Sequence, residues 1–313
     1  MFSTSRLSDK LAPSEKYKAK MILEGYSRIG CDAVNVGAYD LSAGLSFLKS
    51  LADSTTIPFI SANLVEVSSG GLSFEPYLLI EHEPFTVGVI GVTNLLPLHI
   101  KELRQKNYLE TGKSYIDKLK EKADIIVMLV NANRRDKNEI IEAFQDADYI
   151  FLSRDMSKMR PKDMRETRPF LYTSNKQGKY LSVVDLTIAD ADSPLVDVSK
   201  YESEIQTIDR RLASYQRRDK SKPLEELYTN QPSILKKVET LKKNKTSANN
   251  AISTAFNRNI YRSIPMNKKM GDDPQMLSFV DSVFKEIERL GGDTGSKKKS
   301  KKPKVSSNKL RKK

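Results

Sequence analysis

The sequence has one cysteine, two histidines and no tryptophan among its 313 residues. A single cysteine, Cys31, excludes an internal disulfide framework and a thiolate metal site built within one chain. We predict that Cys31 is a packed small side chain rather than a reactive thiol. With so few histidines, a metal centre rich in imidazole ligands is hard to assemble.

Long apolar runs are also missing. No stretch approaches the roughly 18 apolar residues that span a bilayer. The first thirty residues lack an apolar run between a basic start and a small-residue cleavage site, so no signal peptide is recognised. The location therefore stays open. The sequence as given favours the cytoplasm by default, and a periplasmic or exported protein is the alternative if its N-terminus is truncated.

Positive charge is plentiful but unevenly distributed. The formal net charge is +13, yet residues 1–200 hold 26 basic and 27 acidic residues. Residues 201–270 hold 15 basic residues against 7 acidic ones, and the last seventeen residues hold ten basic residues and no acidic one. The basic character thus belongs to the C-terminal third, so the overall charge does not make the whole protein a nucleic-acid-binding one.

The first 190 residues alternate between short apolar runs and amphipathic patterns. Apolar runs at 33–37, 57–62, 77–81, 85–92, 124–130, 149–152, 169–173 and 180–188 predict strands. Patterns at 14–28, 41–52, 112–122 and 136–144 predict helices. This alternation predicts a layered α/β domain. Gly70 and Gly71 predict a hairpin-like turn, so we expect a mixed sheet.

The pattern changes after about residue 197. Apolar residues at three- and four-residue spacing predict helices near 201–215, 234–255 and 276–290, separated by prolines. We expect these helices to pack on each other or on the α/β domain. Gly291 and Gly292 end the last helix, and the lysine-rich segment beyond is predicted to be disordered.

Four segments in order carry a family likeness. They are GCDAVNVGAYDLSAG at 30–44, PFISANL at 58–64, VGVIGVT at 87–93 and a region from ADIIVMLV at 123–130 to DYIFL at 148–152. Together they resemble the 5′-nucleotidase and 2′,3′-cyclic phosphodiesterase branch of the calcineurin-like metallophosphoesterases. The G-x-x-D-L pattern at 37–41 is also similar to a 5′-nucleotidase-like group that includes selenoproteins. The family's opening D-x-H and G-D motifs would precede residue 14, so we expect an N-terminally incomplete domain.

The resemblance implies a site with two divalent metal ions held by Asp, Asn and several His ligands. The family's G-N-H-E segment aligns its Asn and His with Ala38 and Tyr39. A ligating His of the L-S-H-x-G motif aligns with Asn131, and the two histidines of G-G-H-S-H align with Arg154 and Met156. The resemblance therefore implies a degenerate site, and we expect no metal cofactor.

Three polar residues at these motif positions have alternative interpretations. Asp40 is either a residual ligand or, as we favour, the N-cap of the helix that follows. Asn131 either holds a cation weakly or closes a loop by a hydrogen bond, which we favour. Arg154 either binds an anion directly or forms a surface ion pair with Asp155, the alternative we favour.

The sequence thus predicts an α/β protein with three parts. Residues 1–192 form an incomplete metallophosphoesterase-like α/β/β/α sandwich with mixed sheets, residues 193–292 a helical region, and residues 293–313 a disordered lysine-rich tail. The predicted function is that of a non-catalytic scaffold or binding module. The alternatives are an active metal-dependent phosphoesterase with atypical ligands and a polyanion-binding protein that acts through its basic tail.

The tail is the candidate polyanion-binding segment. Its clustered lysines are Lys297, Lys298, Lys299, Lys301, Lys302 and Lys304. Without aromatic residues the tail cannot stack on bases, but it can attract polyanions by counterion release without sequence preference. The alternative is a solvated tail that only aids solubility. No specific partner is readable from the sequence.

Overall fold

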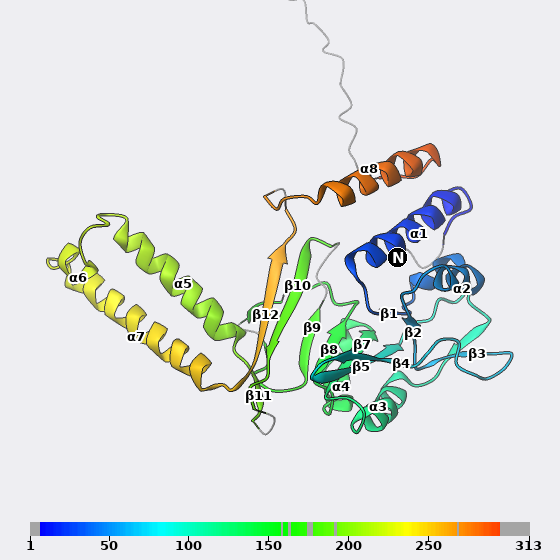
Figure 1. The fold of residues 1–313 in the computed structure, drawn as a ribbon, viewed down its shortest axis with the longest axis horizontal. Coiled ribbons are helices and arrows are strands. Elements are labelled where there is room, and N and C mark those ends of the chain that lie inside the picture. Colours follow the sequence, from blue (N-terminus) through cyan, green and yellow to red (C-terminus); the bar gives the residue numbers. More distant parts are fainter. Residues whose placement is uncertain are drawn as a thin grey trace, which may run out of the picture.

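The computed structural model describes residues 7–157, 159–161, 164–173, 178–190, 193–267 and 269–294 (Figure 1). The predicted tail lysines, from Lys297 onwards, lie outside these residues. Among the described residues, no helix is both long and apolar enough to cross a membrane.

The helices and strands follow one another in a mixed order. In sequence order they are α1 (Ala12–Ile29), β1 (Val34–Asn35), the 3₁₀ helix η1 (Asp40–Ala43), α2 (Leu45–Asp53), β2 (Phe59–Ile60), β3 (Leu64–Glu66), β4 (Tyr77–His82), β5 (Phe85–Thr93), β6 (Leu103–Gln105), α3 (Tyr108–Leu119), β7 (Ile125–Asn131), the 3₁₀ helix η2 (Arg134–Asp136), α4 (Lys137–Ala143), β8 (Tyr149–Leu152), β9 (Phe170–Thr173), β10 (Tyr180–Thr187), β11 (Leu195–Asp197), α5 (Ser199–Gln216), α6 (Leu224–Leu227), α7 (Pro232–Thr254), β12 (Asn257–Pro265) and α8 (Pro274–Arg289).

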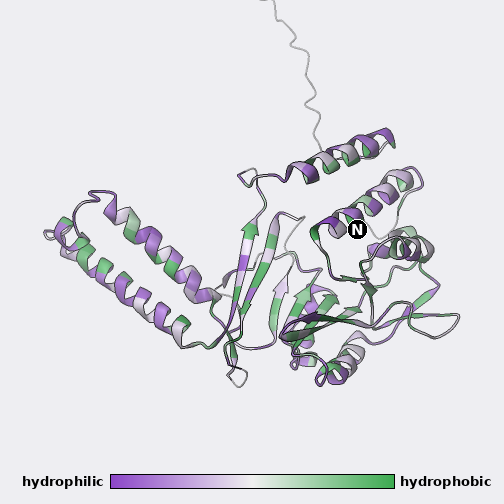
Figure 2. Cartoon of the chain, in the orientation of Figure 1, coloured by the Kyte–Doolittle hydropathy of each residue, from purple (hydrophilic) through white to green (hydrophobic). Residues whose placement is uncertain are grey.

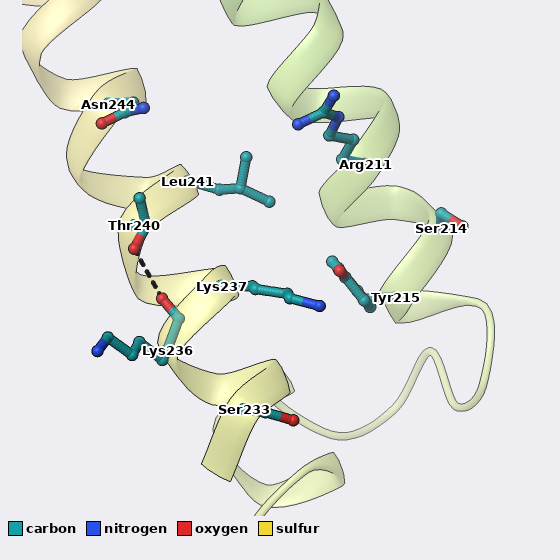
Figure 3. Close-up of a pocket in the computed structure, with 9 residues that line it drawn as sticks. All are labelled: Arg211, Ser214, Tyr215, Ser233, Lys236, Lys237, Thr240, Leu241 and Asn244. Atoms are coloured by element: carbon teal, nitrogen blue, oxygen red, sulfur yellow. Dashed lines mark hydrogen bonds between the residues drawn. The ribbon is translucent and has the colours of Figure 1, made fainter. Parts of the chain in front are cut away.

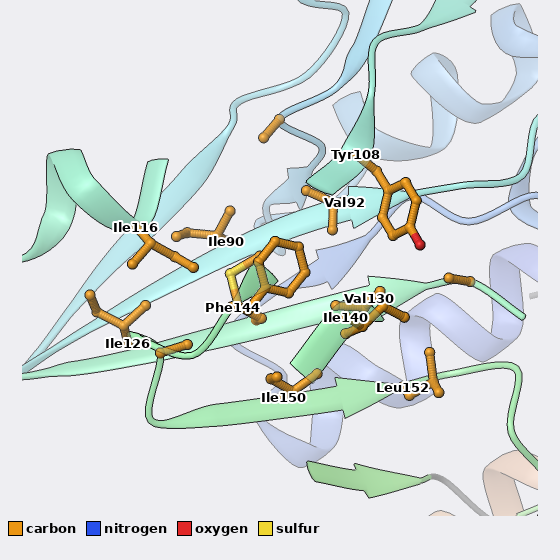
Figure 4. Close-up of a cluster of buried hydrophobic side chains, with 14 of the residues drawn as sticks. Ile90, Val92, Tyr108, Ile116, Ile126, Val130, Ile140, Phe144, Ile150 and Leu152 are labelled. Carbon is orange, nitrogen blue, oxygen red and sulfur yellow. The ribbon is translucent and has the colours of Figure 1, made fainter. Parts of the chain in front are cut away.

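The largest sheet has five strands in the order β4-β5-β7-β8-β9. β5, β7, β8 and β9 are parallel, and β4 joins β5 as an antiparallel edge strand. Helices α3 and α4 cover one face, where Ile116, Phe144 and alternate residues of the strands form a buried core (Figure 4). Side chains of alternate strand residues point to opposite faces, so the other face of β7 presents Ile125 and Val127 to a second layer.

That second layer is a three-stranded sheet in the order β10-β12-β11. β12 pairs antiparallel with β10 and parallel with β11. Its Tyr261 stacks on Tyr172 of β9 with ring centroids 4.7 Å apart and joins an aromatic core with Tyr149 and Phe170. The two sheets therefore pack face to face through aromatic side chains, with helices outside the larger sheet.

A buried polar network fastens the two sheets. Asn259 of β12 donates from Nδ2 to the Tyr172 hydroxyl at 2.5 Å and to the Asp197 carboxylate at 2.6 Å, while its Oδ1 accepts from the Tyr149 hydroxyl at 3.0 Å. Asp197 also accepts from the Ser199 amide at 2.8 Å. Burial, with the nearby Asp197 carboxylate, raises the pKa of Tyr172. Each buried polar group of the network thereby has a partner.

A third cluster lies around α1 and α2. Ala19 and Leu23 of α1, Leu48 of α2 and Phe59 of β2 pack in one core. β1 pairs parallel with β2, and β3 pairs antiparallel with β6. A bridge between Val65 and Leu72 closes the turn at Gly70, as the glycine pair predicts.

The mixed α/β fold predicted from the sequence is confirmed, and each predicted strand and helix has a counterpart. β12 was not predicted, because its apolar residues Ile260, Tyr261 and Ile264 do not alternate and the flanking sequence reads as helical. Both predicted packing modes occur: α5 packs on α7, and α8 packs on α1. The division at residues 192 and 193 stays a prediction.

Replacing Asn259 with leucine is expected to lower the free energy of unfolding by about 3 kcal/mol. The change removes two donors from buried oxygens and one acceptor from Tyr149, and unsatisfied buried polar groups are costly. Urea unfolding followed by circular dichroism measures the effect. Asn267→Ala, at an exposed position, is the control and should stay within about 0.5 kcal/mol of the parent. Equal midpoints for the two variants would contradict the role of this network.

Candidate functional site

The predicted site residues lie where several strands end. β5, β7 and β8 are parallel, so their carboxyl ends meet at one edge of the sheet, and β1 lies beside β5 and β7. Such edges are where open α/β sheets place ligands. Thr93 and Asn131 are the last residues of β5 and β7, and Gly37 and Ser153 lie just beyond β1 and β8.

Asn131 is the centre of a hydrogen-bond cluster at this edge. Its Oδ1 lies 3.2 Å from the Ala38 amide, which donates to it, and 3.1 Å from the Thr93 hydroxyl. Its Nδ2 donates to the Ser153 hydroxyl at 2.7 Å. The predicted loop-closing hydrogen bond is therefore confirmed: one side chain joins the loops after β1 and β8 to the end of β5.

Two glycines let the loops approach this closely. A Cβ at Gly37 would lie 2.9 Å from Asn131 Nδ2, and a Cβ at Gly91 would lie 2.6 Å from Asn35 Oδ1. Asn35 in turn donates from Nδ2 to the carbonyls of Val92 and Leu129, at 3.0 and 2.8 Å. Any side chain on either glycine would push the β1 loop away from the sheet.

Asn35, Asn63 and Thr93, which also cross-link this edge, were not singled out by sequence reasoning. Asn63 is buried and bridges β3 to β5, accepting from the Thr93 amide at 2.9 Å and donating to the Thr93 carbonyl at 2.7 Å. Asn35, Asn63 and Thr93 all stand inside the motif segments. These polar residues are visible within otherwise apolar segments, but the segments were interpreted as strands and their polar side chains were not considered as cross-links.

Asp40 does not act as the predicted N-cap, so that prediction is wrong. It is the first residue of η1, whose N-cap is Tyr39. The Asp40 carboxylate instead accepts from the Gly37 amide at 2.9 Å and so tightens the turn three residues earlier. The turn is short because η1 begins directly after the β1 loop, which leaves no room for a capping residue in extended conformation.

The predicted ion pair between Arg154 and Asp155 is also wrong. The Arg154 guanidinium lies over the Tyr39 ring, 5.1 Å from its centroid. The Asp155 side chain is 1% exposed and accepts from the Ser157 amide and hydroxyl, with Arg134 at 3.8 Å. Adjacent residues in the turn after β8 point in different directions, so Arg154 faces Tyr39 and Asp155 points inward.

Ala38 and Met156 carry no ligand for a hard divalent cation. Ala38 is buried with a methyl side chain, and Met156 is an exposed thioether. The structure thus brings Ala38, Tyr39, Asn131 and Arg154 together at one edge. Met156 follows them with its side chain 63% exposed.

A cavity of about 410 Å³ lies between the two sheets beside this cluster. Its lining comes from β1, β7, β8, β9, β10 and the turn after β8: Asn35, Leu129, Val130, Phe151, Leu152, Ser153, Thr173, Tyr180 and Ser182. The floor is apolar and the remaining groups are hydroxyls and an amide. This composition suits a small polar ligand better than a multivalent cation.

The residues present do not fit a two-metal centre. Such a centre needs carboxylate and imidazole ligands around two ions. Within the described residues, no three His, Cys, Asp or Glu side chains gather closely enough to hold a metal ion. Asn131 Oδ1, the one amide oxygen at a ligand position, already has two donors.

Known proteins share part of this sequence and most of this fold. A 5′-nucleotidase of Vibrio cholerae is 25% identical over 147 residues, which cover 44% of this chain and 27% of that protein. Protein UshA of Escherichia coli is 23% identical over 147 residues, with the same coverage. The calcineurin-like phosphoesterase YfkN of Bacillus subtilis has a TM-score of 0.56 at 13% identity, covering 91% of this chain and 82% of that one. No family model matches the sequence.

These comparisons define the class of the fold first. The layered α/β architecture is that of a calcineurin-like phosphoesterase. Within that class the chain is related to the 5′-nucleotidase branch, at low identity and over part of its length. The match spans only 27% of the length of these curated relatives.

The close approach of Gly37 and Asn131 predicts a non-additive pair of substitutions. Gly37→Ala is expected to destabilise the protein by about 2 kcal/mol, because the new methyl group overlaps the Asn131 amide. In an Asn131→Ala background the same change should cost far less, since its obstacle is gone. Gly271→Ala, whose Cβ would meet nothing within 4 Å, is the control. Additive effects in a denaturation cycle would contradict the packing described here.

Cys31 is expected to react slowly with thiol reagents. Burial raises the pKa of its thiol, a backbone hydrogen bond with Ala33 opposes this rise, and the negative charge of Asp32 adds to it. Less thiolate is then present at neutral pH, and the thiolate is the reactive form. The pH profile of labelling should have its midpoint above that of the same chain in urea. A midpoint below it would contradict this environment.

Proposed function

We propose that this chain is a non-catalytic scaffold or binding module with a 5′-nucleotidase-type fold. The observation that carries the proposal is the Asn131 cluster. Asn131 stands where the family resemblance implies a ligating histidine. Its side-chain oxygen and nitrogen both form hydrogen bonds that close the loops. A side chain used in this way stabilises the edge of the sheet instead of presenting a lone pair to a metal ion.

The neighbouring positions support the same proposal. Ala38 has no polar side-chain atom, and the Asp40 carboxylate is turned back to the Gly37 amide. Arg154 carries a positive charge into a region where two divalent ions would otherwise stand, and like charges repel. These substitutions at the motif positions support a chain that does not hydrolyse phosphoesters.

The cavity between the sheets gives the module a place for a ligand. Its hydroxyl and amide lining and apolar floor fit a small polar molecule held by a few hydrogen bonds. Arg154 lies on the Tyr39 ring beside the same edge, where it can attract a negatively charged group.

The purified chain is expected to hydrolyse a chromogenic phosphodiester in Mn²⁺ at the rate of buffer alone. The physical reason is that, in the part of the chain that the structure describes, no three His, Cys, Asp or Glu side chains gather to hold a metal ion that could activate water. Metal-dependent turnover that Asp40→Ala leaves unchanged indicates a contaminating enzyme. Turnover that Asp40→Ala abolishes in a variant with the parent's thermal midpoint contradicts the proposal and favours an active phosphoesterase with atypical ligands.

The fold is expected to be independent of metal. Burial of the apolar strands contributes about 25 cal/mol per Å² whether or not an ion binds at their ends. The thermal midpoint should therefore be the same in EDTA and in Mn²⁺. A rise of many degrees with Mn²⁺ would contradict this expectation, because only a ligand that binds the folded state shifts the midpoint in that way.

A further inference from the structure

Residues 199–254 form an arm that leaves the α/β body (Figure 1). The arm consists of α5, α6 and α7 and is inserted between β11 and β12, which are neighbours in the sheet. Hydrophilic colours predominate on its two long helices (Figure 2). At about 1.5 Å per residue, α7 alone gives the arm a length of about 35 Å.

The arm has its own small core. Leu224 and Tyr228 near α6 and Val238 of α7 are buried together, with Leu212 and Tyr215 of α5 packed against them. This core holds the two helices side by side, since α5 and α7 contact each other along their length. No large apolar side chain of residues 199–254 is prominently exposed. The outer surface of the arm is therefore mainly polar and can form hydrogen bonds and ion pairs with a partner.

The charges of the arm separate into two groups. Lys242 pairs with Glu225, and Lys245 pairs with Asp209 at 2.6 Å. Arg211, Lys236 and Lys237, in contrast, have no carboxylate within 4.0 Å among the described residues, although all three are exposed. The only acidic residue of α7 is Glu239.

These three cations are among the residues that line a groove of about 750 Å³ at α5 and α7. Lys237 extends from α7 toward α5, whereas Lys236 extends away from it (Figure 3). Its other polar groups include Ser214, Thr240 and Asn244, all exposed, and the half-buried Tyr215 ring lies among them. Lys236, Thr240 and Asn244 are four residues apart, so they follow one another along α7. The groove thus offers positive charge, the Asn244 amide and the Tyr215 ring, which also packs against Tyr228 of the arm core. The Thr240 hydroxyl donates to the Lys236 carbonyl at 2.8 Å.

We propose that this groove binds single-stranded nucleic acid through its phosphate backbone. Cations without carboxylate partners release counterions when they meet phosphates, which provides affinity without sequence preference. An aromatic ring within a basic groove is the other element of single-strand recognition, because every base has a face that can stack. Arg211 and Lys237 come from facing helices, so a strand lying in the groove contacts both.

An anionic membrane is the less favoured partner. Helices that bind membrane surfaces insert an apolar face into the headgroup region. In the arm the apolar side chains are directed between α5 and α7, and none of the large ones is prominently exposed. The proposal does not use the Asn131 cluster, so it stands or falls independently of the proposed function.

The test compares full-length proteins that differ by the same loss of charge. The arm variant carries Arg211→Gln, Lys236→Gln and Lys237→Gln. The matched body variant carries Lys101→Gln, Lys113→Gln and Lys122→Gln, all exposed positions outside the arm. A third variant replaces Lys297, Lys298, Lys299, Lys301, Lys302 and Lys304 with glutamine. Thermal midpoints within a degree or two of the parent establish that all are folded.

Binding to a fluorescent 20-nucleotide oligo-dT is measured by anisotropy from 50 to 300 mM salt. We expect the arm variant to bind at least tenfold more weakly at 50 mM salt. Its plot of log affinity against log salt should be shallower by about 2, because three phosphate contacts are lost. The body variant should match the parent, and the tail variant should keep the salt slope contributed by the arm.

The proposal is overturned if the arm variant binds oligo-dT as the parent does. It is also overturned if binding disappears with the tail variant alone, which assigns the interaction to the tail. Vesicles with 30% anionic lipid provide the remaining comparison. Tighter binding to these vesicles than to oligo-dT, lost in the arm variant, would identify a membrane surface as the partner instead.

Discussion

The architecture depends on the polar contact that Asn259 makes inside an otherwise apolar interface. β12 lies between β10 and β11 and completes the second sheet only after the chain has left for the arm and returned. Asn259 then joins Asp197 beside β11 to Tyr149 and Tyr172 of the larger sheet. A buried carboxylate is tolerated because donors surround it: the Ser199 amide nearby in the chain, Asn259 of the neighbouring strand and the Tyr172 hydroxyl of the larger sheet. The network thus couples the arm's return strand to the alignment of the sheets.

The edge of the larger sheet is closed by polar side chains. Parallel strands end together there, and the loops after β1 and β8 converge on them. Amide and hydroxyl hydrogen bonds of Asn131, Thr93 and Ser153 hold these segments together. Gly37 permits this closure because it has no Cβ. The backbone framework of this edge is therefore fixed by side-chain hydrogen bonds as well as by the sheet itself.

The arm carries a basic groove that lies apart from the edge of the larger sheet. Its small core makes α5 and α7 a unit with its own apolar contacts, and its free cations face a groove instead of the sheets. The α/β body is nearly neutral in sequence, whereas the arm carries positive charge on exposed side chains. Electrostatic attraction of a polyanion would therefore be directed to the arm, where charge is concentrated.

The sequence by itself determined the layered α/β class, the strands of the larger sheet and the family resemblance. Those features depend on local apolar periodicity and on motif spacing, which are readable along the chain. Only the tertiary structure decided the roles of Asp40, Arg154 and Asn259. Asp40 accepts from the Gly37 amide and Arg154 lies over the Tyr39 ring. Neither contact could be predicted, because the direction of a side chain in a turn depends on the neighbours that folding brings near. β12 was not predicted for the same reason: its strand character comes from partners 62 to 85 residues earlier in the chain, at β11 and β10.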